Sequence, residues 1–147
     1  YWQGRLEART ATTFVSSALL ALPSLRQMFA DDELAILTFN AEVLKSPAFA
    51  PSLGSFGGPI VDLGEESYLR QVISNNLPAM DRQRAEDEIV RLVDGMCADG
   101  KVKALLLECT NLPPYKQALK AKFDIEIFDI LTLIDSIKAN LVDPAYL

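Results

Sequence analysis

The chain has 147 residues and a formal net charge of −6, and half of its residues are apolar. This length and composition suffice for one compact α/β domain, because domains of about 100–150 residues are the commonest. Acidic and basic residues alternate along the chain, so it has no basic face to bind nucleic acid or an anionic membrane. Histidine is absent, which excludes Ser-His-Asp triads, Cys-His pairs, HExxH zinc sites and a histidine base. Chemistry must therefore use Cys, Asp, Glu, Lys or Tyr.

The two cysteines, Cys97 and Cys109, have the spacing of neither a disulfide framework nor a metal site. We therefore expect a reducing, cytoplasmic environment and no metal site built on the two cysteines. The apolar stretch 14–25 follows two arginines as a secretory signal would, but Pro23 and Arg26 cut it short.

The first half of the chain contains two expected strands. Residues 34–38 form a short apolar run of the kind typical of a buried parallel strand. Residues 58–62 are a weaker strand candidate, and the proline- and glycine-rich segment 48–59 predicts a surface loop. Apolar residues then recur at helical spacing, which predicts an amphipathic helix over 82–98.

The second half repeats the alternation of strand and helix. The run 102–107 is the strongest strand, and 125–128 is a fourth. A helix should start at Pro113 or Pro114, where proline suits a first turn, and reach about residue 121. Another should begin near Thr132 and run towards Leu141. This order predicts an α/β fold: a parallel four-stranded sheet with helices on both faces.

In such a sheet the ligand lies beyond the carboxyl ends of the strands. Cys109 occupies that position after the most apolar strand and before the expected helix. A cysteine at a helix start is stabilised as the thiolate, the form that acts as base or nucleophile. Thr110 and Asn111 could hold a carboxylate beside it. The alternative is that Cys109 is an inert buried residue, as we expect of Cys97 on the apolar stripe of the 82–98 helix.

Other polar residues at the same edge have two interpretations each. Thr38 and Asn40 could orient a substrate, but both residue types also favour helix caps and turns. Asp129 could line the cleft or only cap the last helix, and Ser16 and Ser17 could line it or only form a strand-to-helix turn.

Residues 104–115, Ala-Leu-Leu-Leu-Glu-Cys-Thr-Asn-Leu-Pro-Pro-Tyr, followed by Phe-Asp-Ile-Leu-Thr-Leu-Ile at 128–134, resemble the aspartate/glutamate/hydantoin racemase family. That family pattern has a Cys-Thr pair after an apolar strand, then a polar turn into a helix, then a strand ending in Asp-Ile. The stretch 14–20 leading to 34–38 also looks like the family's passage into its second lobe.

The resemblance implies two similar α/β lobes facing each other across a cleft. Each lobe contributes one catalytic cysteine, without pyridoxal phosphate or metal, for proton transfer at the Cα of a small carboxylate. Cys109 matches the second-lobe cysteine, Thr110 its neighbour that helps to hold the substrate carboxylate, and Thr38 and Asn40 a substrate-binding turn. The resemblance thus implies an isomerase, and homodimers are common in that family.

The resemblance also implies a division of the chain. Residues 14–131 correspond to the second lobe, and residues 1–13 and 132–147 to margins that would pack on a missing first lobe. The counterpart of the first-lobe cysteine is missing, so we expect the 147-residue chain alone to be inactive. Single-cysteine relatives, of the arylmalonate decarboxylase or maleate isomerase type, and a non-catalytic small-molecule-binding or partner-binding domain remain alternatives.

Overall fold

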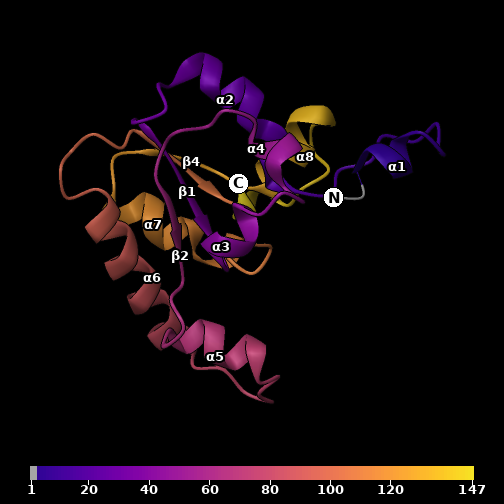
Figure 1. Ribbon diagram of the computed structural model, residues 1–147. Helices are drawn as coiled ribbons and strands as arrows, with labels where there is room; N and C mark the ends of the chain where they lie inside the picture. The colour runs from indigo at the N-terminus through magenta and orange to yellow at the C-terminus, as the bar shows by residue number, and fades with distance from the viewer. Residues whose placement is uncertain (1–2) are drawn as a thin grey trace.

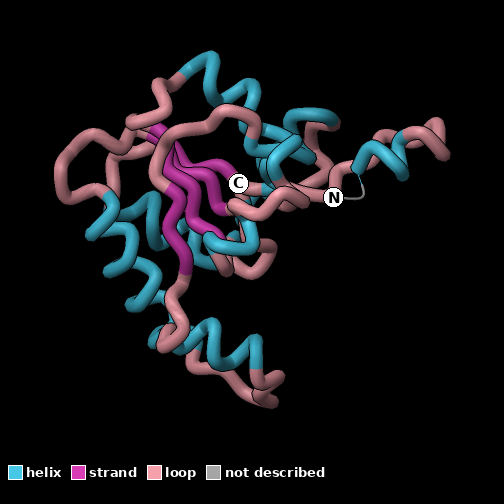
Figure 2. The backbone as a smooth tube through the Cα atoms, in the orientation of Figure 1, coloured by secondary structure: helices cyan, strands magenta, loops and turns pink. Residues whose placement is uncertain are grey.

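The computed structural model describes residues 3–147. Four parallel strands form one sheet in the order β2-β1-β3-β4 (Figures 1 and 2). The strands are β1 (Leu34–Thr38), β2 (Ile60–Asp62), β3 (Ala104–Leu107) and β4 (Glu126–Phe128). The predicted α/β class, the parallel sheet and all four strands are confirmed. β1 has the predicted bounds, and the other three begin one or two residues late.

The two inner strands are buried on both sides, as their continuous apolar runs predicted. Alternate residues of β1 face opposite layers, with Ala35 and Leu37 in one core cluster and Leu34 and Ile36 in the other. The sheet therefore has two separate cores, each covered by its own set of helices.

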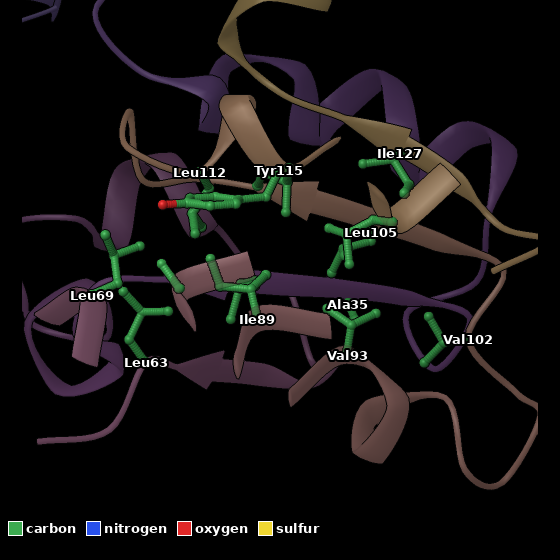
Figure 3. Packing of buried hydrophobic residues seen from close by; sticks show 14 residues of the cluster. Ala35, Leu63, Leu69, Ile89, Val93, Val102, Leu105, Leu112, Tyr115 and Ile127 are labelled. Carbon is green, nitrogen blue, oxygen red and sulfur yellow. The ribbon is translucent and has the colours of Figure 1, made fainter. Parts of the chain in front are cut away.

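The first core lies under α6 (Arg82–Met96) and α7 (Lys116–Lys122). The predicted 82–98 period is confirmed, because Ile89 and Val93 of α6 are buried against the sheet opposite Leu105 of β3 (Figure 3). α5 (Tyr68–Ser74) closes the same core at the β2 side through Leu69. No helix was expected from the sequence at the position of α5.

The second core lies under η1 (Ala18–Ala21) and α2 (Leu22–Met28), with α3 (Ala41–Leu44) and α4 (Ala50–Leu53) completing the layer (Figure 1). The apolar stretch 14–25 therefore forms helical segments that pack in the core, since Leu19, Leu22 and Leu25 are buried. The prediction that 48–59 is only a loop was wrong. It contains α4, whose Leu53 packs in this core.

The last predicted helices differ from the structure at their ends. The segment from Pro113 begins as a 3-10 turn, η2 (Pro113–Tyr115), before α7 continues it. The final helix is α8 (Ile130–Ile137), which starts two residues before the predicted Thr132 because Asp129 caps it. Two short terminal elements, α1 (Gln3–Glu7) and η3 (Pro144–Tyr146), complete the chain.

Within residues 3–147, no helix combines the length and the apolar character needed to cross a bilayer. The division into a lobe at 14–131 with flanking margins stays a prediction, and residues 1–2 of the first margin lie outside the described part. The two flanks lie on either side of one hollow, which Thr12 and Thr13 line together with Ile134, Ile137 and Leu141.

Candidate functional site at the carboxyl edge of the sheet

The carboxyl ends of β1 and β3 are joined by a side-chain network centred on Glu108. The strands pair with Leu37 opposite Leu107, and the Glu108 N–H extends the ladder to the Leu37 carbonyl over 2.9 Å. Thr38, the next residue of β1, donates its hydroxyl to Glu108 Oε2 over 2.8 Å. Ser17, before η1, donates to Oε1 over 3.5 Å. Three distant segments thus fix one half-buried carboxylate.

A hollow of about 250 Å³ opens beside this carboxylate. Its lining combines polar strand-end residues with aromatic and aliphatic side chains: Thr38, Phe39, Asn40, Val43, Leu44, Phe49 and Glu108. The predicted residues Thr38 and Asn40 are therefore brought together, along with Glu108. Small-molecule sites commonly have this character of an apolar wall with few polar groups.

The thiol of Cys109 lies directly after Glu108 in the turn that leaves β3. It is half-buried and packs at the margin of the first core. Asn111 donates its side-chain amide to Cys109 Sγ over 3.7 Å, and the Leu112 N–H closes the turn on the Cys109 carbonyl over 3.0 Å. Thr110 and Asn111 are exposed. The three predicted residues therefore share one turn, adjacent to the hollow but outside its lining.

The surroundings of this thiol differ from the predicted helix start. The helical segment after Cys109 begins as the three-residue 3-10 turn η2 and becomes α-helical only at Lys116. The amide of Asn111 is the donor that the structure places at the thiol instead.

Asn40 has the helix-capping role that was one of its two interpretations. It is the N-cap of α3, and its Oδ1 accepts the N–H of Val43 over 3.0 Å. Next to it, the Asp62 carboxylate at the end of β2 accepts the N–H groups of Ala41 and Gly64, each over 2.9 Å. The Ala41 hydrogen bond above all lowers the pKa of Asp62. The β1 and β2 edge loops are thus held by two side-chain acceptors.

Asp129, at the carboxyl end of β4, is closed to solvent. Its Oδ1 accepts the Thr132 N–H over 2.8 Å in a capping box, while Oδ2 lies 3.4 Å from Lys116 Nζ. Both side chains of the pair are fully buried. Burial lowers the pKa of Lys116, and the Asp129 charge opposes that shift. The prediction that Asp129 caps the last helix is confirmed. Its ion pair with the buried Lys116 was not predicted.

Cys97 ends α6 as its C-cap and packs against the first core, as predicted. Burial, followed by the charges of Asp94 and Asp99, raises the pKa of its thiol. Both cysteines are free thiols.

Within residues 3–147, no three His, Cys, Asp or Glu side chains gather as a metal site would require. The absence of a metal or cofactor from the reaction stays an expectation from the sequence.

Known relatives of this chain are lyases. Dimethylsulfoniopropionate lyase 3 of Emiliania huxleyi is 28% identical over 153 residues, covering 97% of this chain and 40% of the relative. Dimethylsulfoniopropionate lyase 6 of the same organism is 29% identical with the same coverage. Lyase 5 is 41% identical over 70 residues, which cover 46% of this chain. The chain thus spans about 40% of the length of the first two relatives. No protein-family model matches the chain.

These comparisons contradict the racemase interpretation. The relatives carry the name of a lyase that acts on a sulfonium carboxylate, so the isomerase class and the two-thiol racemisation were wrong. The single-cysteine relatives and the non-catalytic binding domain gain no support from them either. The motif around Cys109 correctly predicted a strand, a turn at the carboxyl edge of the sheet and a following helical segment. Such an arrangement is compatible with many reactions.

Proposed function

We propose that this chain forms the part of a dimethylsulfoniopropionate-cleaving lyase that carries the Cys109 thiol. The observation that carries the proposal is the match to two lyases along 97% of the chain. Its support in the structure is a thiol at the carboxyl edge of a parallel sheet, next to a half-buried carboxylate and a hollow. Parallel sheets bind ligands at this edge.

The reaction of such a lyase is an elimination. The Cys109 thiolate takes a proton from the carbon beside the substrate carboxylate. The electron pair left on that carbon forms the double bond, and the bond from the neighbouring carbon to sulfur breaks. Neutral dimethyl sulfide leaves with the electrons of that bond, and acrylate remains. The thiol then releases its proton to water, which restores the thiolate.

Two structural features suit Cys109 to the role of base. The Asn111 amide donates a hydrogen bond to its sulfur over 3.7 Å, which fixes the position of the sulfur in the edge turn. The side chain is half-buried at an edge turn, so a substrate can approach it. Thr110 and Asn111, both exposed in the same turn, are proposed to hold the substrate carboxylate, and Thr38 and Asn40 to line the neighbouring hollow.

The compartment and the small-molecule partner are also proposals. Two free thiols suit a reducing cytoplasm. The partner that we propose is a small carboxylate substrate.

Replacing Cys109 with alanine in the full protein tests the assignment. We expect dimethyl sulfide release to fall by about 10²–10⁴-fold, the usual contribution of a positioned base. Headspace gas chromatography measures dimethyl sulfide, and NMR measures acrylate. Cys97→Ala is the matched control, because it removes the other thiol far from the edge and should keep most of the activity.

Two results would overturn the proposal. Wild-type protein that releases neither dimethyl sulfide nor acrylate is not this lyase. Protein in which Cys109→Ala is as active as Cys97→Ala uses another base. In D₂O, unreacted substrate or acrylate that carries deuterium beside the carboxylate would support reversible proton removal there.

A further inference from the structure

We infer that the hollow beside Glu108 is the subsite for the methylated sulfonium cation. This inference rests on the proposed function, because the cation is one end of the substrate named for the relatives. It assigns roles to Glu108 and Phe49, neither of which the sequence motif singled out. The occupant is a group with one positive charge, two methyl groups and no hydrogen-bond donor.

The carboxylate of Glu108 is the negative wall of this subsite. Thr38, which is buried, and Ser17 donate hydroxyls to its two oxygens, so its orientation is fixed from two sides. Neither neighbour carries a positive charge. Glu108 therefore keeps its charge free for a ligand, unlike Asp129, which a buried lysine neutralises.

The remaining walls suit methyl groups and a diffuse cation. Val43 and Leu44 offer aliphatic surface, and Phe49 offers an aromatic ring. A methylated cation cannot donate hydrogen bonds, so it gains from aromatic faces and a nearby carboxylate more than from a polar pocket. Phe39 also lines the hollow, but the Arg70 guanidinium already lies over its ring, 5.4 Å from the centroid. Phe49 is therefore the ring assigned to the cation.

The placement relative to the thiol fits the elimination. Glu108 and Cys109 are consecutive residues, so their Cα atoms are about 3.8 Å apart. In the substrate, the sulfur and the carbon that loses the proton are separated by one carbon atom. The proposal therefore places the reacting carbon of a substrate whose cation lies beside Glu108 at the turn that carries Cys109.

The chemistry also predicts which kinetic constant responds. The cation becomes neutral dimethyl sulfide as its bond breaks, so the attraction to Glu108 is stronger in the bound substrate than in the transition state. An interaction that favours bound substrate lowers KM without raising kcat. Glu108 is thus a substrate-binding residue and a means of releasing the neutral product.

Two probes of the same shape isolate the charge. The first is 3-(trimethylammonio)propanoate, a stable methylated cation, and the second is 4,4-dimethylpentanoate, in which a neutral carbon replaces the ammonium nitrogen. Isothermal titration calorimetry on the full protein measures both dissociation constants. We expect Glu108→Gln, which keeps the shape and an oxygen acceptor for Thr38, to weaken the cation about tenfold, equivalent to about 1.4 kcal/mol. The neutral probe should bind equally to both proteins.

A second variant and a control keep the test independent of folding. Phe49→Leu should weaken the cation about two- to fivefold, as loss of an exposed cation–π contact does, and leave the neutral probe less affected. Glu126→Gln is the matched control, because Glu126 is exposed at the amino end of β4, opposite the edge with the site. It should change neither constant. Thermal unfolding by circular dichroism checks that each variant is folded.

The outcomes separate the two proposals. If dimethyl sulfide is released but Glu108→Gln binds both probes as wild type does, the subsite is wrong and the lyase stands. If the cation binds in a Glu108-dependent way but no dimethyl sulfide forms, the subsite stands as a methylated-cation site and the lyase is wrong. An equal loss for both probes in Glu108→Gln also overturns the subsite, because the charge would then play no part.

Discussion

Two carboxylates follow neighbouring strands of this sheet and have opposite surroundings. β3 and β4 pair with Leu106 opposite Phe128, so Glu108 and Asp129 come close after that pair on the same edge. Glu108 is half-buried, takes hydroxyl donors and lines a hollow. Asp129 is fully buried and faces Lys116. The difference shows that polar residues at the carboxyl edge differ in their access to a ligand, because Glu108 lines a hollow whereas Asp129 is held in an ion pair inside the fold.

The closed carboxylate should carry the larger share of stability. In Asp129→Asn the amide oxygen still accepts the Thr132 N–H, so the cap remains while Lys116 loses its counter-charge. We expect the free energy of unfolding to fall by about 3–5 kcal/mol, the usual cost of leaving one buried charge unpaired. Urea unfolding followed by circular dichroism measures this loss.

The control is Asp124→Asn, an exposed position between α7 and β4, which should lie within about 0.5 kcal/mol of wild type. The double variant Lys116→Met/Asp129→Asn removes both charges and should recover part of the loss. A loss below about 1 kcal/mol in Asp129→Asn would contradict the comparison, because a 0.5–1.5 kcal/mol effect is that of an ordinary neutral hydrogen bond.

The open carboxylate should matter less for stability and more for binding. Thr38→Val removes the hydroxyl that donates to Glu108 Oε2 at nearly unchanged side-chain shape. Because Glu108 is half-buried, water can replace the donor, and we expect a loss of about 0.5–1.5 kcal/mol in urea unfolding. The same variant should weaken 3-(trimethylammonio)propanoate, since the carboxylate is no longer held from the β1 side. Tighter binding of that cation would contradict the role assigned to Thr38.

The sheet was predictable because its signals are local. The uninterrupted apolar run of β1 gave its bounds, and the helical period located α6 to within two residues. α5 was missed because a distant residue starts it: its cap Ser67 and the Tyr68 N–H both bond the Glu88 carboxylate of α6. Short helices of this kind depend on tertiary contacts more than on propensity.

The site was predictable only in part for the same reason. Cys109, Thr110 and Asn111 are consecutive, so a motif could find them together. Glu108 joins Thr38, 70 positions away, and no local pattern marks that bond. The reaction was mispredicted because the strand and turn around a thiol do not identify the leaving group. The proposed subsite is lined by residues 38–49 and by Glu108, segments far apart in the sequence, so no local pattern could identify it.

The thiol of Cys97 is half-buried, as is that of Cys109, but it lies outside the carboxyl edge. Cys97 has a pKa raised by burial and then by the carboxylates of Asp94 and Asp99, so its thiolate forms only at higher pH. In Cys109→Ala, where Cys97 is the remaining thiol, the rate of iodoacetamide alkylation should rise with a midpoint above the ordinary thiol value of about 8.5. Added salt should lower that midpoint, because it screens the two carboxylates. A midpoint at or below the ordinary value would mean that burial does not raise the pKa of Cys97, and a raised midpoint that salt does not move would mean that the two carboxylates contribute nothing to the shift.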